Sequence, residues 1–265
     1  MKNDDPNVNV VFELIEINKI PIIPLKDIML KKKIGEGGQA KVYKGTYKGI
    51  EVAVKVIANV DWKCFAHEIV ILSNLTHECI PTFYGMVVEE NILATVIKYI
   101  NGKTLNNCKV MELQDDTKMK IAYDLGTVLN YIHTNNFIHR DLKPENIILD
   151  ENHKMFLIDF GIAKICTNID FTITRAKGTI YYLASECLDA ADYTETKDII
   201  SLITTKVDVW GYGCIVSYLY SGCPPWCEKG IENPLVVQKQ LMQKIDFPIP
   251  KNITDEKIIE VIKLS

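Results

Sequence analysis

The sequence predicts an α+β protein built from two lobes, and three observations lead to this fold class. The first hundred residues are rich in β-branched side chains and are punctuated by glycines, as is typical of short antiparallel strands. Most of the remainder has apolar residues at helical spacing. The pair Asn101-Gly102 breaks the pattern between these regions, so we expect two lobes with a cleft between them.

The elements of the first lobe begin near the N-terminus. Residues 8–17 alternate in part between polar and apolar and predict a strand. Residues 18–27 contain two prolines and predict an extended connector. Residues 28–57 are rich in β-branched side chains and predict three antiparallel strands, with Lys48-Gly49 at the second turn.

Further elements follow from the same two periodicities. The sequence predicts a helix over 61–75, strands over 82–88 and 93–100, a helix over 115–133, short strands over 147–149 and 156–158, and an apolar helix over 207–220. The order is strands first and helices second, which supports the α+β class.

Composition narrows the possible functions. Of the 265 residues 48% are hydrophobic and 24% charged, and the net charge of -4 does not favour broad binding to nucleic acid or to an anionic membrane. No apolar run reaches about 18 residues, so we expect no membrane span. The first residues lack the pattern of a signal peptide and the eight cysteines form no C-x-x-C pair, which predicts reduced thiols in an intracellular, cytoplasmic protein.

A glycine-rich stretch, IGEGGQAKV at 34–42, resembles the dinucleotide fingerprint G-x-G-x-x-G except for Ala40. That fingerprint requires a helix directly after the glycines, whereas a strand is expected here. The stretch is therefore a hairpin turn. Its backbone amides could cover phosphates, because glycines allow close approach, or it could be a plain turn.

A lysine lies inside an apolar strand at VAVKVI, residues 52–57. Burying the ammonium group of Lys55 without a partner is costly. Lys55 could lie on an edge strand with its head in water. Alternatively it could face a phosphate and be held by a carboxylate, and Glu68 on the expected helix is suited to that role.

A dense group of polar residues follows the helix over 115–133. The stretch FIHRDLKPENIILD places Asp141, Lys143 and Asn146 within six residues, and Asp159 follows in the apolar stretch LIDFGIA. A surface turn does not need an acid, a base and an amide at these positions. A phosphoryl-transfer site does.

These motifs, in this order and spacing, resemble the eukaryotic protein kinase family. The matched residues are Gly35, Gly37, Val42, Ala53, Val54, Lys55, Glu68, His139, Arg140, Asp141, Asn146, Asp159, Phe160 and Gly161. The stretch from Pro24 to Ile57 is most similar to the tyrosine-kinase-like group of serine/threonine kinases.

The resemblance implies a bilobal kinase fold whose C-terminal helices are incomplete. We expect an N-terminal extension at 1–27, a β-rich N-lobe at 28–97, a hinge at 98–102 and a helical C-lobe at 103–265.

The resemblance also implies a role for each matched residue. Asp141 is expected to accept or orient the substrate hydroxyl proton, Lys143 to steady the γ-phosphate, and Asn146 and Asp159 to hold Mg²⁺ or Mn²⁺. Lys55 is expected to contact the α- and β-phosphates and to pair with Glu68. The implied ATP-binding residues are Ile34, Gly35, Glu36, Gly37, Gly38, Gln39, Ala40, Val42, Ala53, Lys55, Lys98, Ile100 and Ile148.

Further implied contacts concern the hinge and the core. Alignment of VIKYING makes Ile97 the gatekeeper, with the backbone of Lys98 and Ile100 at the adenine edge, and Val42, Ala53 and Ile148 around the ring. The regulatory hydrophobic stack would comprise Phe83, Leu72, Phe160 and His139, held by Asp208.

The chain departs from the family pattern at three places. Ala40 replaces the third glycine, which we expect to be tolerated. Ser185 replaces a proline and should loosen its segment, and Glu186 lacks the arginine with which the family pairs it. The segment between Tyr193 and Asp208 is longer than the family pattern. The extra residues are interpreted as a surface insertion, with a docking element as the alternative.

Control of activity is also implied. Arg140 beside Asp141 suggests that an upstream kinase phosphorylates Thr172 or Thr174, since a phosphate there could pair with Arg140 and order the loop. The main expectation is an active serine/threonine kinase that acts on protein substrates. A pseudokinase scaffold that binds nucleotide, and a tyrosine or dual-specificity kinase, are the alternatives; Lys143 disfavours the latter.

Overall fold

The computed structural model describes residues 13, 15–37, 40–58, 62–89, 92–160, 164–165, 179–187, 204–227, 230–231, 233–243 and 249–265. The chain divides into two compact units. The first comprises the described residues within 1–102 and 158–163, and the second those within 103–157 and 164–265.

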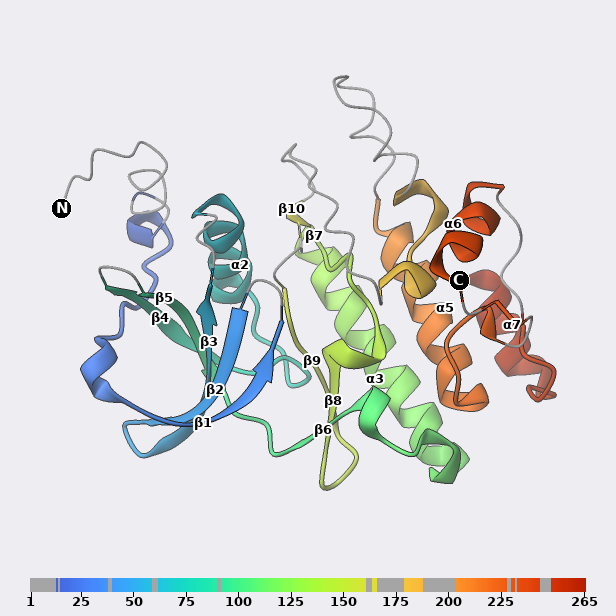
Figure 1. The fold of residues 1–265 in the computed structure, drawn as a ribbon, viewed down its shortest axis with the longest axis horizontal. Helices are drawn as coiled ribbons and strands as arrows, with labels where there is room; N and C mark the ends of the chain where they lie inside the picture. The colour runs from blue at the N-terminus through green and yellow to red at the C-terminus, as the bar shows by residue number, and fades with distance from the viewer. Residues whose placement is uncertain are drawn as a thin grey trace, which may run out of the picture. The chain divides into compact units, whose positions relative to one another are not determined.

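The first unit is built on a five-stranded antiparallel sheet with the order β1-β2-β3-β5-β4 (Figure 1). Its strands are β1 (Ile28–Glu36), β2 (Ala40–Tyr47), β3 (Ile50–Ile57), β4 (Phe83–Glu89) and β5 (Ile92–Lys98). The three strands predicted within 28–57 and the two that follow are confirmed. Lys48 and Gly49, with φ of 48° and 78°, form the predicted turn, because a two-residue hairpin of type I′ requires positive φ at both positions.

One face of this sheet forms an apolar core. Valines at alternate positions of β3, Val52 and Val54, are fully buried, as are Ala94 and Val96 on β5. Ile23, from the segment before the sheet, joins the same cluster. Alternate side chains of a strand point to the same face, so the period of two in the sequence sets which residues enter the core.

Helix α2 (Trp62–Asn74) packs against this sheet and confirms the helix predicted over 61–75 (Figure 1). Phe65, Ile69 and Leu72 are buried at helical spacing. The same helix carries Glu68, which is only 5% exposed. The packing of the apolar face therefore determines where this carboxylate lies.

The segment before the sheet differs from the prediction. Glu13 and Ile15–Ile17 are helical, so the strand predicted over 8–17 is wrong at the residues that the structure describes. The reason is tertiary: Ile15 buries its side chain beside α2 instead of pairing in the sheet. The connector that follows includes a parallel bridge from Ile22 to Met86 of β4 and a short 3-10 turn, η1 (Leu25–Asp27).

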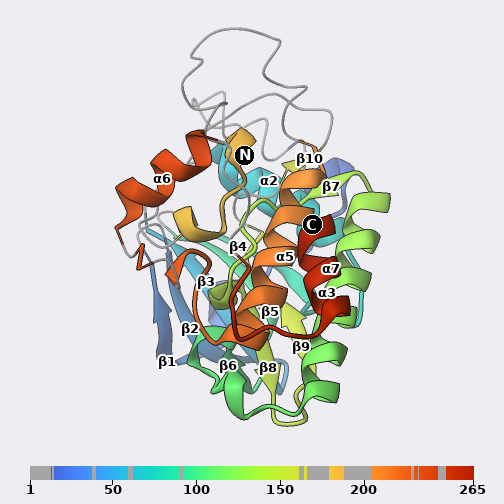
Figure 2. The same ribbon diagram turned by 90° about the vertical axis from the view of Figure 1, so that its right-hand side faces the viewer.

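The second unit is mainly helical. Helix α5 (Lys206–Ser221) packs against both α3 (Asp115–Thr134) and α7 (Glu256–Leu264), as Figures 1 and 2 show, and α6 (Pro234–Met242) lies near η5 (Thr179–Tyr182). The predicted helices over 115–133 and 207–220 are confirmed. Within the described ranges, no helix is long and apolar enough to cross a membrane.

Short strands and turns of the second unit flank these helices. Strands β6 (Gly102–Thr104), β8 (Ile147–Asp150) and β9 (Met155–Leu157) form a three-stranded sheet in that order, and β7 (Phe137–Ile138) pairs with β10 (Lys164–Ile165). The connecting 3-10 turns are η2 (Leu105–Asn107), η3 (Val110–Glu112) and η4 (Pro144–Asn146).

The α+β class with a strand-rich part and a helical part is thus confirmed. The segment that carries Asp141, Lys143 and Asn146 leads from β7 to β8.

Candidate active site

The first group of functional side chains lies within the first unit and centres on Lys55. Its Nζ is 3.0 Å from both Oε1 and Oε2 of Glu68 and 2.7 Å from Oδ1 of Asp159. The three residues lie on β3, on α2 and just after β9, far apart in the sequence. The fold therefore brings one ammonium group between two carboxylates.

Lys55 lies on β3, in the interior of the sheet, between Val42 on β2 and Thr95 on β5. The interpretation of Lys55 as an edge-strand lysine is therefore wrong. Its side chain is 22% exposed and that of Asp159 is 43% exposed, whereas Glu68 is almost fully covered. Lys55 and Asp159 thus keep surface that a ligand could contact.

The electrostatics of this group follow from burial and pairing. Burial disfavours the charge on Lys55, but attraction by Glu68 and Asp159 outweighs it and raises the Lys55 pKa. Burial raises the pKa of Glu68, because Lys55 only partly counteracts it and Asp159 adds a second negative charge. Lys55 is consequently a permanent cation that can attract phosphate oxygens at any physiological pH.

Asp159 adopts a backbone conformation that few side chains occupy, with φ of 65°. Such a conformation costs about 1–3 kcal/mol for a non-glycine residue and persists only where the surroundings enforce it. In this protein it accompanies a carboxylate that contacts Lys55.

The glycine-rich stretch forms the hairpin between β1 and β2. Gly35 pairs with Val42, and the Gly37 N–H donates to the Ala40 carbonyl at 2.9 Å. Ile34 and Glu36 lie on β1, and Glu36 forms an ion pair with Lys33. A strand follows the turn, so the hairpin interpretation is confirmed. Gly38 and Gln39 lie outside the described residues.

The strand register shows where the residues expected to contact adenine lie relative to the expected hinge. Ala53 is opposite Ile97, and β5 ends at Lys98. The Lys98 N–H donates to the Thr82 carbonyl at 2.8 Å. A backbone contact between Lys98 and adenine would therefore have to use the Lys98 carbonyl oxygen. Ile100, two residues further on, is buried. Ile148, on β8 of the second unit, is half-buried. The contacts of these residues with adenine stay a prediction.

The second group of functional side chains lies within the second unit, on the loop between β7 and β8. Lys143 Nζ is 2.5 Å from Asp141 Oδ2. The Asn146 amide nitrogen donates to the same carboxylate oxygen at 2.9 Å and to the Asp141 backbone carbonyl at 2.8 Å. One cation and one amide therefore fix the orientation of the Asp141 carboxylate.

The start of this loop is held by a buried carboxylate from α5. Asp208, with no exposed surface, accepts the His139 N–H at 2.8 Å and the Arg140 N–H at 2.7 Å. His133 Nε2 lies 2.8 Å from the same carboxylate. Arg140 has a positive φ of 69°, so Asp208 stabilises a backbone conformation that is otherwise unfavourable.

The residues expected to form a hydrophobic stack are described separately in the two units. Leu72 and Phe160 are buried and Phe83 is half-buried in the first unit, and His139 is fully buried in the second. Asp208 contacts the backbone of His139. The stacking of these four side chains stays a prediction.

The side chains expected to hold a divalent cation offer oxygen ligands. The Asn146 amide nitrogen is used in hydrogen bonds to Asp141, and the same side chain also carries a carbonyl oxygen. Asp159 supplies a partly exposed carboxylate. Amide and carboxylate oxygens are the donors that hard divalent cations prefer, so each residue by itself offers a suitable ligand atom.

Sequence reasoning missed the contribution of His133, whose position on an amphipathic helix gave no signal beyond that of an ordinary half-buried residue. Ser185 Oγ contacts Glu186 Oε2 at 3.4 Å, so this glutamate has a neighbour within its own segment. Thr172 and Thr174 lie outside the described residues, and of the longer segment between Tyr193 and Asp208 only the part from residue 204 onward is described.

The fold, with the two groups of charged residues, defines a protein of the phosphoryl-transfer class. A sequence model described as the protein kinase domain matches residues 28–263, which is most of the chain. The chain therefore belongs to the protein kinase family, and membership implies the use of ATP and a divalent cation.

Curated relatives agree with this assignment. RasGEF domain-containing serine/threonine-protein kinase X of Dictyostelium discoideum is 30% identical over 80% of this chain and 22% of that protein. Serine/threonine-protein kinase STY46 of Arabidopsis thaliana is 30% identical over 91% of this chain and 41% of that protein. An Aurora kinase of Debaryomyces hansenii is 30% identical over 91% of this chain and 58% of that protein. The chain thus spans between about a fifth and three fifths of the length of these relatives.

Proposed function

We propose that this protein is an active serine/threonine protein kinase that transfers the γ-phosphate of ATP to hydroxyl groups of protein substrates. The observation that carries the proposal is the completeness of the charged groups. Lys55 contacts both Glu68 and Asp159, and the Asp141 carboxylate is held by Lys143 and Asn146. A nucleotide-binding scaffold would not need the second group.

The mechanism assigns a task to each side chain. Lys55 binds phosphate oxygens as a fixed cation, and Glu68 orients it. The Asp141 carboxylate orients the attacking hydroxyl and accepts its proton, and Lys143 stabilises the transferred phosphoryl group. Asn146 and Asp159 would hold a divalent cation, which we infer to be Mg²⁺ with Mn²⁺ as a substitute, and the bound cation would supply neutralisation of phosphate charge. The hairpin at 34–42 covers the nucleotide.

Specificity for serine and threonine is supported by Lys143, two residues after Asp141, and by the names of the relatives at 30% identity. We infer in addition that an upstream kinase activates the protein at Thr172 or Thr174. The support is the position of Arg140 directly before Asp141, where a cation could pair with a phosphate.

The test measures phosphate transfer from radiolabelled ATP to generic protein substrates, followed by phosphoamino-acid analysis. We expect transfer to serine and threonine, and a loss of about a thousandfold in kcat for Asp141→Asn, because general base catalysis contributes about 10²–10⁴-fold. Asp150→Asn is the matched control, since Asp150 is an aspartate of the same unit that caps the turn after β8.

Two results would refute parts of the proposal. Wild-type protein that transfers no more phosphate than Asp141→Asn would identify a nucleotide-binding scaffold instead. Phosphotyrosine as the main product would identify a tyrosine or dual-specificity kinase. Turnover that Lys55→Ala abolishes would exclude the scaffold.

A further inference from the structure

The segment before the sheet, residues 15–25, which we call the strap, is attached along β4 by backbone contacts. The Met86 N–H donates to the Pro21 carbonyl at 2.9 Å, and the Ile23 N–H donates to the Met86 carbonyl at 2.8 Å. At the far end of the strap the Leu25 N–H donates to Glu89 Oε1 at 2.7 Å. The strap thus pairs with the edge strand of the sheet.

Strand β4 contains a glycine whose position matches this attachment. Gly85 has a φ of 148°, and the register between β4 and β5 shifts between Phe83 and Gly85. A Cβ at this position would lie 2.4 Å from the Pro21 carbonyl oxygen and 3.1 Å from the Ile23 side chain. Only glycine lets the strap backbone approach so closely.

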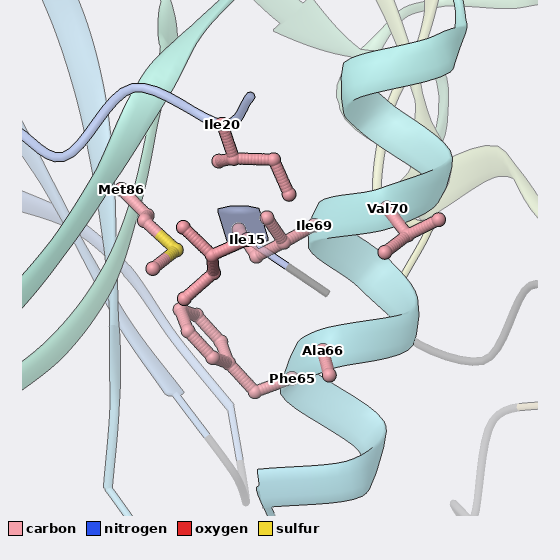
Figure 3. A pocket seen from close by; sticks show the side chains of 7 residues that line it. All are labelled: Ile15, Ile20, Phe65, Ala66, Ile69, Val70 and Met86. Carbon is pink, nitrogen blue, oxygen red and sulfur yellow. The ribbon is translucent and has the colours of Figure 1, made fainter. Parts of the chain in front are cut away.

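The strap also packs against α2. Ile15 and Ile20, each 6% exposed, converge with Met86 of β4 on Phe65 and Ile69 of α2 around a small apolar hollow (Figure 3). Further along α2, Asn74 Nδ2 lies 3.5 Å from Asn18 Oδ1. The strap therefore joins β4 to one face of the helix.

The face of α2 that meets the strap is next to the functional carboxylate. Phe65 lies one turn before Glu68 and Ile69 directly follows it. Both are at most 2% exposed, so a change in their packing displaces the helix at this turn. Such a displacement separates Glu68 from Lys55, whose contact is 3.0 Å.

We propose that the strap is a positioning element, with Ile15 and Ile20 holding α2 so that Glu68 reaches Lys55. This inference rests on the proposed kinase function. The isoleucines act through Glu68 and contact no reacting group. Activity accordingly depends on residues outside the matched kinase domain, which begins at residue 28.

The experiment compares wild type with the double variant Ile15→Ala/Ile20→Ala. We expect kcat/KM to fall about tenfold, as for other substitutions that couple to a distant site without touching the ligand. Conservative Ile15→Val/Ile20→Val should keep most of the activity. The control is Ile253→Ala, which removes an equally exposed isoleucine from the second unit and should leave activity unchanged.

A double-mutant cycle separates positioning from general destabilisation. If the strap acts through Glu68, adding Ile15→Ala/Ile20→Ala to Glu68→Gln should change kcat/KM by less than about twofold, because coupled sites are not additive. A further tenfold loss in the Glu68→Gln background would overturn the proposal. If the wild-type enzyme is active, unchanged activity of the double variant would also overturn the proposal.

Hydrogen exchange keeps the inference testable if the wild type proves inactive. Amides of α2 should exchange faster in Ile15→Ala/Ile20→Ala than in wild type, whereas those of α3 should not change. Unchanged exchange of the α2 amides would overturn the proposed role of the strap. An inactive wild type in which α2 still loosens would refute the kinase proposal alone, so the two failures are distinguishable.

Discussion

The two groups of functional residues are assembled in different ways. Lys55, Glu68 and Asp159 come from separate elements, and a helix must be positioned before the first pair can form. Asp141, Lys143 and Asn146 lie within six residues of one another and contact each other directly. The first group therefore depends on the packing of whole elements, and the second on the conformation of one loop.

This difference shows where each group can be disrupted. The loop needs a backbone that places three neighbours correctly, and the buried Asp208 provides it by accepting the amides of His139 and Arg140. The ion pair needs α2, whose position depends on apolar contacts far from the charges. Substitution of Asp208 should therefore disrupt the loop in a single step. Substitutions in the apolar contacts of α2 should instead weaken the ion pair, and with it activity, gradually.

The largest effect is expected when the support of the loop is removed. Asp208→Ala leaves one buried and one partly buried amide donor without their acceptor, and a buried donor left unpaired costs about 1–3 kcal/mol. We expect the free energy of unfolding to fall by about 3 kcal/mol, measured by urea denaturation, and activity to be lost.

Asp255→Ala is the matched control for that variant. Asp255 also accepts two backbone amides, from Lys257 and Ile258, but it is exposed at the start of α7. Loss of an exposed helix cap costs about 1 kcal/mol. Equal destabilisation by the two substitutions would show that burial of Asp208 is not what matters.

The same comparison explains how far the sequence predicts the structure. The strands of 28–57 and helix α2 follow from local periodicity, and the compact motif around Asp141 could be interpreted chemically because its members are neighbours. The strap could not, because the burial of Ile15 beside α2 is a tertiary contact that leaves no local pattern. Gly85 was the available signal, since a glycine inside a strand often marks close backbone approach.

A smaller effect is expected beneath the loop. In α5, a Cβ added to Gly211 would lie 2.8 Å from Cβ of Leu142, which is bonded to Asp141 in the chain. Overpacking of this kind costs about 1–3 kcal/mol, more than the roughly 1 kcal/mol that alanine gains over glycine in a helix. Gly211→Ala should therefore lower both the unfolding free energy, by about 1 kcal/mol, and kcat.

Gly126→Ala should change the unfolding free energy in the opposite direction. Gly126 lies in α3, and its added Cβ would meet Tyr212 at 3.6 Å, an ordinary contact distance. The helical gain should then dominate and stabilise the protein by up to about 1 kcal/mol. Thermal denaturation of both variants checks the prediction, and a stabilised Gly211→Ala would show that Leu142 moves freely.

The smallest effect concerns the pH dependence of the ion pair. Because the Glu68 pKa is raised in the folded protein, the native state binds more protons than the unfolded state above the ordinary value of 4.5. Stability that this residue contributes is present below that pH and is lost as the pH rises through the folded pKa. Lys55 stays charged throughout this window, since its pKa is raised too.

Glu68→Gln removes this titration, so its stability relative to wild type should increase as the pH rises from 4.5 towards 7. Urea denaturation across this range measures the difference. Glu36→Gln should show the reverse trend, because the hydrogen bond from Lys33 lowers the pKa of Glu36 and its contribution is lost as the pH falls. If the stability difference between Glu68→Gln and wild type did not change with pH, Lys55 would fully offset the effect of burial on Glu68.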